Sequence, residues 1–348
     1  MDIPAADGSG SLTRRPTISD VAKAAGVSIA VVSYALNGRP GVSAATRERV
    51  LRVADEFGWR PSAAARSMRT GPRAVGLVLG RGADATAHAT SFLDFVTATQ
   101  EVVAARGLAL VLQIVGSVDE AVATYRTWWA ERRFDVMIVA DPLTRDPRVE
   151  ALARMRAPAV VLGPPEVAQG LATVWLDDQE AFTRVGTYLL ELGHREVALV
   201  TGPAASHRTR VRLDSLTAAL GRAGGTVAHE PTNATAEEAA AATRRLLTSP
   251  LPPSAIVYDS DQMAVAALDV ARRTGLEVPW DLSILAGSDS ALCRLATPSI
   301  TTLPAPLSAL GAAVGEAVLA VLDGDHDASR MVPMGGIAVR GSTGPRAR

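Results

Sequence analysis

Cysteine and aromatic residues are scarce in this chain of 348 residues. The single cysteine, Cys293, excludes an internal disulfide framework and is typical of a protein from a reducing compartment. Aromatic residues make up 4% of the sequence, so we expect a core built from alanine, valine and leucine. Because 48% of the residues are hydrophobic and 20% are charged, the composition excludes a disordered chain and indicates a well-buried globular protein.

Membrane and export signals are also lacking. No apolar run reaches the roughly 18 residues that a membrane-spanning helix needs. The N-terminal residues MDIPAADGSGSLTRRP contain no apolar core of the kind found in secretory signals, and we expect residues 1–16 to form a disordered arm. These absences predict a cytoplasmic protein without a membrane partner.

Patterns for metal binding and catalysis are missing as well. The histidines show no metal-ligand spacing: His88, His194, His207, His229 and His326. Neither a P-loop lysine nor a G-x-S-x-G motif is present. Residues 80–85 fit the dinucleotide pattern G-x-G-x-x-A, but no acidic residue for a ribose follows the next predicted strand. We expect no catalytic site, no metal and no cofactor; a nicotinamide enzyme stays an alternative that bound nicotinamide would support.

Positive charge is concentrated near the N-terminus. Residues 13–73 contain eleven Lys/Arg and four Asp/Glu, a net charge of +7, whereas the whole chain has a net charge of −1. A small basic region joined to a larger acidic one is typical of a protein that binds a polyanion through its basic part.

Three short helices are predicted within this basic region. Thr17 and Asp20 form a helix start signal, and Gly26 ends that helix. Ser28 caps a second helix that runs to residue 36, and Ser43 caps a third. Five side chains of the third helix are predicted to point inward: Val50, Leu51, Val53, Ala54 and Phe57. Two helices joined by a short turn are typical of a helix-turn-helix, whose second helix enters the major groove, although such bundles also occur as protein-binding modules.

Residues 72–343 alternate short apolar runs with helix-like stretches, which predicts parallel β/α units. A first series of strands is expected at residues 74–79, 108–112, 136–139 and 159–162. A second series is expected at residues 174–176, 197–200, 255–258 and 283–286, with a last strand at 332–339. The two series predict two lobes, lobe 1 from about residues 72–172 and 303–331 and lobe 2 from about 173–302 and 332–343. Ligands bind beyond the carboxyl ends of such strands, so we expect a cleft between the lobes.

The words TISDVAKAAGVS, VVSYALNG and VSAATRERVLRVADEFGWRPSAAARSM resemble the headpiece of the LacI/GalR family of bacterial transcription regulators. The resemblance implies an all-α helix-turn-helix headpiece at residues 17–60, a hinge helix at 61–71, and an α/β body of two parallel-sheet lobes similar to periplasmic binding proteins. The headpiece residues that it places on DNA are Thr17, Ser28, Ile29, Ala30, Val31, Ser33, Tyr34, Asn37 and Arg47. The hinge residues that it places on DNA are Ser62, Ala65, Arg66 and Met68.

Three positions depart from the family pattern. Val31 and Tyr34 stand where the family usually has Thr and often has Arg, so the operator sequence of better-known members does not carry over to this chain. Met68 stands where a family leucine wedges into the minor groove. Residues 62–69 are too few for a stable isolated helix, so we expect them to fold on DNA, with a plain surface linker as the alternative.

The stretches LELGHREVALVTG and AIVYDSDQMAVAALDVARRTGLEVPWDLSILAGSDSALCRLATPSITTLPAP resemble the family's ligand-binding body. The resemblance implies effector contacts at Ser206, Arg208, Arg212, Ser260 and Asp289. Arg212 and Asp289 would supply the main polar contacts, although a purely structural ion pair between them is an alternative. The side chain of Trp175 is predicted either to stack on a sugar ring or to pack in the core at the lobe junction.

Together these features predict a cytoplasmic homodimeric transcriptional regulator. We expect a repressor that binds a palindromic operator in double-stranded DNA and responds to a small-molecule effector, a sugar. The helix at residues 92–106 is expected at the dimer interface. Activation and corepressor-dependent repression use the same fold and stay alternatives. A sugar-binding transport receptor would share the body but would leave the basic headpiece without a purpose.

Overall fold

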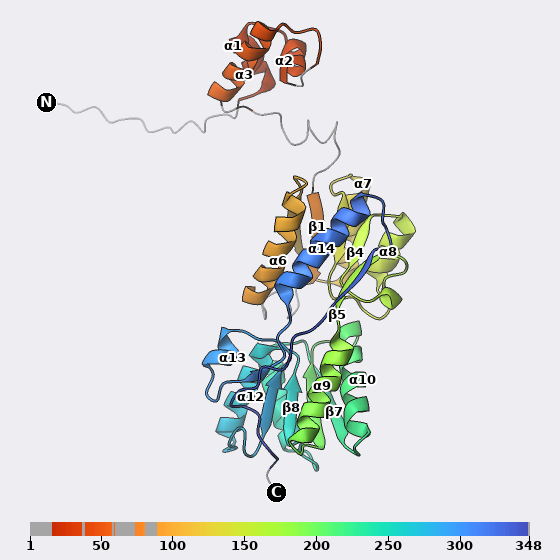
Figure 1. The fold of residues 1–348 in the computed structure, drawn as a ribbon, viewed down its shortest axis with the longest axis vertical. Coiled ribbons are helices and arrows are strands. Elements are labelled where there is room, and N and C mark those ends of the chain that lie inside the picture. The colour runs from red at the N-terminus through yellow and green to blue at the C-terminus, as the bar shows by residue number, and fades with distance from the viewer. Residues whose placement is uncertain (1–15, 37–38, 58, 60–73, 81–88, 347–348) are drawn as a thin grey trace, which may run out of the picture. The chain divides into compact units, whose positions relative to one another are not determined.

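The computed structural model describes residues 16–36, 39–57, 59, 74–80 and 89–346, apart from the side chains of 89–91. The chain divides into two compact units, residues 1–71 and 72–348, which are called here the head and the body (Figure 1). Most of the predicted arm and the whole predicted hinge lie outside the described residues. Five predicted DNA contacts also lie outside them: Asn37, Ser62, Ala65, Arg66 and Met68.

The head contains the three predicted helices, α1 (Ile18–Ala25), α2 (Ile29–Leu36) and α3 (Ala44–Glu56). A capping box between Thr17 and Asp20 starts α1, because each side chain accepts a hydrogen bond from the backbone N–H of the other residue. Gly26 ends α1 in the left-handed region with φ 65°, which glycine adopts without strain. Ser43 caps α3 by accepting from the N–H of Thr46.

The core of the head is small and aliphatic, and consists of Val21, Ala22, Ala25, Val32, Ala35, Val50 and Ala54. Two inward-facing predictions for α3 were wrong, since Leu51 is 47% exposed and Phe57 is 41% exposed. Leu51 follows Val50 and is therefore turned by about 100° around the helix, away from the inner face. Phe57 is the C-cap residue of α3, beyond the last turn that packs on α1 and α2.

Lobe 1 is a six-stranded parallel sheet in the order β11-β5-β4-β3-β1-β2. Its strands are β1 (Ala74–Gly80), β2 (Ala109–Val115), β3 (Val136–Val139), β4 (Ala159–Val161), β5 (Ala172–Leu176) and β11 (Ser329–Val332). One face packs on α6 (Ala89–Ala104) and α14 (Leu307–Leu322), and the other on α7 (Val118–Ala130) and α8 (Pro147–Met155). Strand residues alternate between these faces, as Leu77 and Val78 do.

Two strand predictions for the lobes were wrong. β5 belongs to the first sheet, not the second. It pairs in parallel with β4 on one side, where Val160 of β4 takes part, and with β11 on the other, where Val174 of β5 takes part. The chain therefore first leaves lobe 1 after Leu176 rather than at residue 172. The last strand, expected at residues 332–339, is β11 at Ser329–Val332. Short apolar runs show that a strand exists but not which sheet it joins.

Lobe 2 is a five-stranded parallel sheet in the order β10-β9-β8-β6-β7. Its strands are β6 (Glu196–Thr201), β7 (Thr226–Pro231), β8 (Ala255–Tyr258), β9 (Ser283–Ala286) and β10 (Thr301–Thr302). One face packs on α9 (Asp178–Glu191) and α10 (His207–Gly221), and the other on α11 (Ala236–Leu247) and α12 (Asp261–Arg273). A short helix, α13 (Ala291–Leu295), lies beside α12 (Figure 1). The edge strand β7 was not predicted, because its side chains are only half buried.

The chain passes between the lobes after β5, after β10 and after β11. After β10 it enters α14, which packs closely along α6 (Figure 1). Gly311 permits this approach, since a Cβ atom there would meet the backbone of Phe95, and the Thr99 hydroxyl donates to the Gly311 carbonyl over 3.1 Å. Within the described residues no single helix is long and apolar enough to cross a membrane, and only the bent pair of α1 and α2 taken together reaches that length and apolarity.

Candidate functional site

Helix α2 presents most of the predicted DNA-reading residues to solvent. Val32 and Ala35 pack in the head core, so the opposite side of the helix points outward. Ser28, Ile29, Ala30 and Tyr34 are exposed, while Val31 and Ser33 are half-buried. Ile29 is 50% exposed, which is unusual for an isoleucine and leaves its side chain available for contact with thymine methyl groups. Thr17, at the start of α1, is also exposed.

Arg47 has a structural contact that the sequence did not indicate. Its guanidinium donates to the carbonyl of Arg39 over 2.7 Å and so ties α3 to the segment that follows α2. The Nε atom of Arg47 is buried and has no hydrogen-bond partner among the described residues. The guanidinium of Arg39 lies 5.7 Å from the centre of the Tyr34 ring, which places positive charge beside α2, the helix predicted to read DNA.

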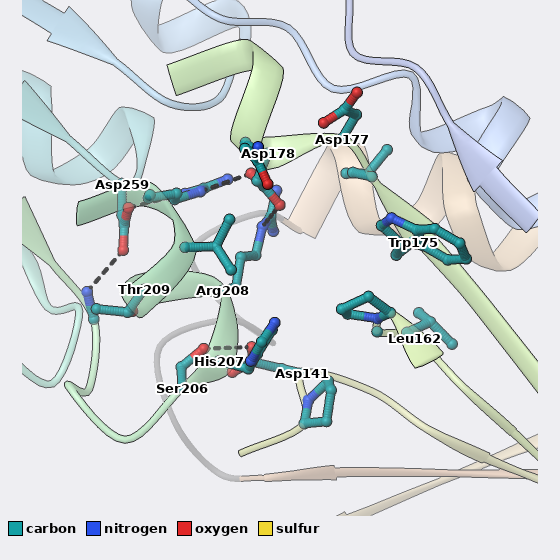
Figure 2. A pocket seen from close by; sticks show the side chains of 18 of the residues that line it. Asp141, Leu162, Trp175, Asp177, Asp178, Ser206, His207, Arg208, Thr209 and Asp259 are labelled. Carbon is teal, nitrogen blue, oxygen red and sulfur yellow. Dashed lines mark hydrogen bonds and ion pairs between the residues drawn. The ribbon is translucent and has the colours of Figure 1, made fainter. Parts of the chain in front are cut away.

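The carboxyl ends of the strands of both lobes line a cleft with two neighbouring cavities. The larger one, called here the main cavity, measures about 970 Å³ and is bounded by residues that end β1, β3, β4, β8 and β9: Gly80, Ala140, Leu162, Asp259 and Gly287. The smaller one, called here the side chamber, measures about 560 Å³ and lies against the β5–α9 crossover (Figure 2). Both cavities share Asp141, Arg208, Arg212 and Asp259. This position is where open α/β sheets bind ligands.

Arg212 on α10 forms the centre of a buried ion cluster. Its Nε donates to Asp178 over 2.8 Å, and its Nη1 donates to Asp259 over 2.8 Å. The Arg208 Nε donates to the second oxygen of Asp178 over 2.8 Å. Figure 2 shows Asp178, Arg208 and Asp259 around the side chamber. The ring of Phe182 lies 4.8 Å from the Arg212 guanidinium and shields it from water.

The cluster keeps Arg212 and Asp178 ionised. Burial opposes the charge on Arg212, but Asp178 and Asp259 outweigh it and raise the pKa of Arg212. Burial opposes the charge on Asp178 in the same way, but Arg208 and Arg212 lower the pKa of Asp178 below its usual range. The described hydrogen bonds of Arg212 use Nε and Nη1, so Nη2 is the donor that Arg212 can offer to a ligand.

Asp289 also lines the main cavity, three residues after the end of β9. Arg340 holds it with two hydrogen bonds of 2.9 Å, and Arg294 adds a third of 2.9 Å. Burial raises the pKa of Asp289, but the two arginines outweigh burial and hold that pKa below its usual range. The alternative of an Arg212–Asp289 ion pair was wrong, because Arg212 pairs with Asp178 and Asp259 instead.

The three remaining predicted effector contacts have different surroundings. Arg208 is 42% exposed and lines both cavities. Ser206 lines only the side chamber, and its hydroxyl donates to Asp141 of lobe 1 over 2.9 Å, so it joins the lobes. Ser260 also lines only the side chamber, but it is 2% exposed and its hydroxyl caps α12 by accepting from the N–H of Met263. Of the five predicted effector residues, the main cavity brings together Arg208, Arg212 and Asp289.

Four site residues were missed by sequence reasoning: Asp141, Asp178, Asp259 and Arg340. Three of these residues follow the carboxyl end of a strand within two residues: Asp141 after β3, Asp178 after β5 and Asp259 after β8. The sequence reveals such positions once the strands are assigned. Arg340 carries no such signal, because it lies far from Asp289 in sequence and outside any regular element.

Comparisons with known proteins agree with this architecture. Residues 17–62 match the family described as bacterial regulatory proteins, lacI family, and residues 187–343 match a periplasmic binding protein-like domain. The solved structure of the lac repressor dimer bound to operator and the anti-inducer ONPF has a TM-score of 0.82 at 23% identity, covering 95% of this chain and 100% of that chain, which supports the fold. The transcriptional regulator CelR–cellobiose complex has a TM-score of 0.71 at 26% identity, covering 94% and 100%.

Curated relatives match along nearly the whole chain. The HTH-type transcriptional repressor PurR of Escherichia coli O139:H28 (strain E24377A / ETEC) is 29% identical over 306 residues, 85% of this chain and 87% of that protein. The HTH-type transcriptional regulator AglR of Rhizobium meliloti (strain 1021) is 30% identical over 346 residues, 94% of both chains. The predicted family is confirmed, and so is the expectation that the protein is not an enzyme. This chain belongs to the LacI family of DNA-binding bacterial transcriptional regulators.

Proposed function

We propose that this regulator is a cytoplasmic homodimeric repressor whose affinity for a palindromic operator changes when a small polyhydroxylated ligand, a sugar, binds in the main cavity. The observation that carries the proposal is the combination in one chain of an exposed reading helix and an interlobe cleft with oriented charged groups. A DNA-binding head without a sensing body, or the reverse, would not support effector-controlled binding.

The reading helix is tested by placing a negative charge on it. Ala30→Asp faces outward from α2, so it would repel phosphates without disturbing the head core. Affinity of the full chain for the DNA upstream of its own operon should fall at least about tenfold, since a base-contact mismatch costs about 1–3 kcal/mol. Ala218→Asp, on an exposed face of α10 in the body, is the matched control and should leave DNA affinity unchanged in an anisotropy titration.

Polar groups of the main cavity support a hydroxyl-rich ligand. Arg208 and Arg212 offer donors, Asp259 and Asp289 offer acceptors, and Leu79, Leu307 and Leu310 supply apolar walls. The similar structure of CelR is a complex with cellobiose, which supports a sugar as the class of ligand.

A calorimetric screen of the full chain with cellobiose and other mono- and disaccharides tests this assignment. Asp289→Asn should lower the affinity for a bound sugar about tenfold. Asp269→Asn removes a carboxylate on α12 whose side chain is 40% exposed, and it should not change that affinity. The same sugar should weaken operator binding. A sugar that strengthens operator binding would instead indicate a corepressor, and affinity that is unchanged in Asp289→Asn would remove Asp289 from the ligand site.

Dimer formation is supported by an exposed apolar patch on lobe 1. β2 is an edge strand of its sheet, and its side chains and those of α6 expose Leu93, Val111, Leu112 and Ile114. Leu292 and Leu295 on α13 form a second exposed pair in lobe 2. Ile114→Lys should shift the chain toward the monomer in sedimentation velocity. Leu251→Lys is the control and should not, because this exposed leucine lies in lobe 2, between α11 and β8.

A further inference from the structure

We propose that the side chamber is a second ligand site, separate from the main cavity, and that it binds a small organic ammonium ion with a compact ring. The site is formed by Trp175, Asp177, Glu180, Glu166 and His207. These residues line the side chamber and do not line the main cavity. The proposal requires neither operator binding nor a sugar in the main cavity.

The side chamber has an aromatic wall and the size for a small molecule. Its volume of about 560 Å³ falls within the range of ligand pockets. The indole of Trp175 lies on one side of the space, and His207 and Arg208 lie on the other (Figure 2). Trp175 is half-buried at the end of β5, so its ring is held by the sheet while it remains accessible from the chamber. A fixed indole favours a cation or a flat apolar ring.

The charge of the side chamber selects among ligands. Six carboxylates and two arginines line it, a formal net charge of −4, whereas four carboxylates and three arginines line the main cavity, a formal net charge of −1. Both arginines of the side chamber already pair with Asp178. Glu166, Asp177 and Glu180 form no ion pair with an arginine or lysine of the described chain. The chamber therefore attracts cations and repels phosphates and carboxylates.

The imidazole of His207 forms part of the wall of the side chamber but is not a hydrogen-bonding contact for a ligand. Both of its ring nitrogens are buried and have no hydrogen-bond partner among the described residues, so neither presents surface to a molecule in the chamber. Oε1 of Glu166 is 3.7 Å from Nε2, which is too far for a hydrogen bond. The carboxylates and the indole, which are accessible, are therefore the groups that a ligand would contact.

An ammonium ion satisfies these groups better than a neutral hydroxyl. Asp177 and Glu180 lie together at the start of α9, where Asp177 accepts from the backbone N–H of Glu180. An ammonium group offers three donors and a positive charge to these two carboxylates, whereas a hydroxyl offers one donor and no charge. A compact ring attached to the ammonium would lie on Trp175.

The experiment compares cyclohexylamine, which is an ammonium ion at neutral pH, with cyclohexanol, which has the same ring but no charge. Both are titrated into the full chain, and binding is followed by calorimetry and by indole fluorescence. Cyclohexylamine should bind one equivalent at least about tenfold more tightly than cyclohexanol, because several carboxylates contribute to its attraction. Its affinity should fall as salt is raised from about 0.05 M to about 0.5 M.

Two variants and two controls locate the binding. Asp177→Asn with Glu180→Gln should weaken cyclohexylamine about tenfold; asparagine retains the oxygen that caps α9, so the helix start is preserved. Glu191→Gln removes one negative charge from the C-terminal end of α9 and should change affinity by less than about twofold, because salt screens exposed charges at that distance. Trp175→Leu should abolish the fluorescence change and weaken binding. Asp289→Asn, in the main cavity, should leave cyclohexylamine affinity unchanged.

Equal affinity for the amine and the alcohol would overturn the proposal, as would equal losses in the double variant and in Glu191→Gln. Loss of cyclohexylamine binding in Asp289→Asn would also overturn it, because the ligand would then be in the main cavity. Failure of sugar binding or operator binding in the same preparations would contradict the proposed function and leave the side chamber result standing.

Discussion

The two residues predicted to sense the effector, Arg212 and Asp289, both line the main cavity but have opposite surroundings. Arg212 is one cation between two carboxylates and is 4% exposed. Asp289 is one carboxylate between two arginines and is 16% exposed, and one of those arginines reaches into solvent. Both keep their charge, but for different reasons. Arg212 depends on its partners because it is buried, whereas water screens part of the cluster around Asp289.

The largest effect is expected when Arg212 is replaced by alanine. Asp178 and Asp259 would lose their shared partner, and Asp178 would remain buried, so stability should fall by about 3–5 kcal/mol. Arg210→Ala, two residues earlier on the exposed side of α10, removes the same charge and should cost less than about 0.5 kcal/mol. Urea unfolding of both variants measures the difference. Similar losses of stability in the two variants would show that the burial of Arg212 does not make it more important than the exposed Arg210.

A smaller effect is expected for Arg340→Ala. The variant removes two hydrogen bonds from Asp289 and the bonds that Arg340 donates to Ile300 and Thr302, but Arg294 still pairs with Asp289. Stability should fall by about 1–2 kcal/mol. Differential scanning fluorimetry and urea unfolding would report it, and a loss as large as that of Arg212→Ala would remove the contrast between the two clusters.

The smallest effect is expected for Arg294→Ala. The side chain of Arg294 is 56% exposed, so its single bond to Asp289 is strongly screened and should contribute about 0.5 kcal/mol or less. A double variant with Arg340→Ala should lose more than the sum of the two single variants, since Asp289 would then lose both arginines. Strictly additive losses in urea unfolding would mean that the two arginines act independently.

Acid should weaken both clusters. A carboxylate whose folded pKa lies below its unfolded value contributes stability that is complete above about pH 4 and is lost as pH falls through the folded pKa. Asp178 and Asp289 both have lowered pKa values, so the free energy of unfolding should decrease below about pH 4. In Arg340→Gln the pKa of Asp289 moves back toward its ordinary value, so the decrease between pH 4 and about 2 should be shallower. If the free energy of unfolding of Arg340→Gln depends on pH as steeply as that of the unmodified chain, Asp289 does not contribute to the loss of stability in acid.

The head was predicted from sequence more fully than the cleft. Thr17, Gly26 and Ser43 act within a few residues of themselves, so local sequence was enough to place the three helices. The wrong positions in α3, Leu51 and Phe57, depended on how helices pack, which local pattern does not reveal.

The ion partners in the cleft depended on long-range geometry. Arg212 and Asp289 were placed at the cleft by resemblance, but their partners were not predictable. Asp178 is 34 residues from Arg212, and Arg340 is 51 residues from Asp289. The assignment of β5 to the wrong lobe moved the predicted crossover away from Asp178 and concealed its role. Only the paired register of β4, β5 and β11 shows where the chain leaves lobe 1.

The path of the C-terminal segment determines when during synthesis the body can be completed. Lobe 1 lacks an edge strand until Ser329–Val332 has been made. Lobe 2 then needs two later residues. Arg340 donates hydrogen bonds to Asp289, and the carbonyl of Gly344 contacts His194. The head, in contrast, has its own core within residues that precede the body in the chain. On the ribosome, the head can therefore fold while the sheets of the body are still incomplete, and the two lobes are finished only after Gly344 has been translated.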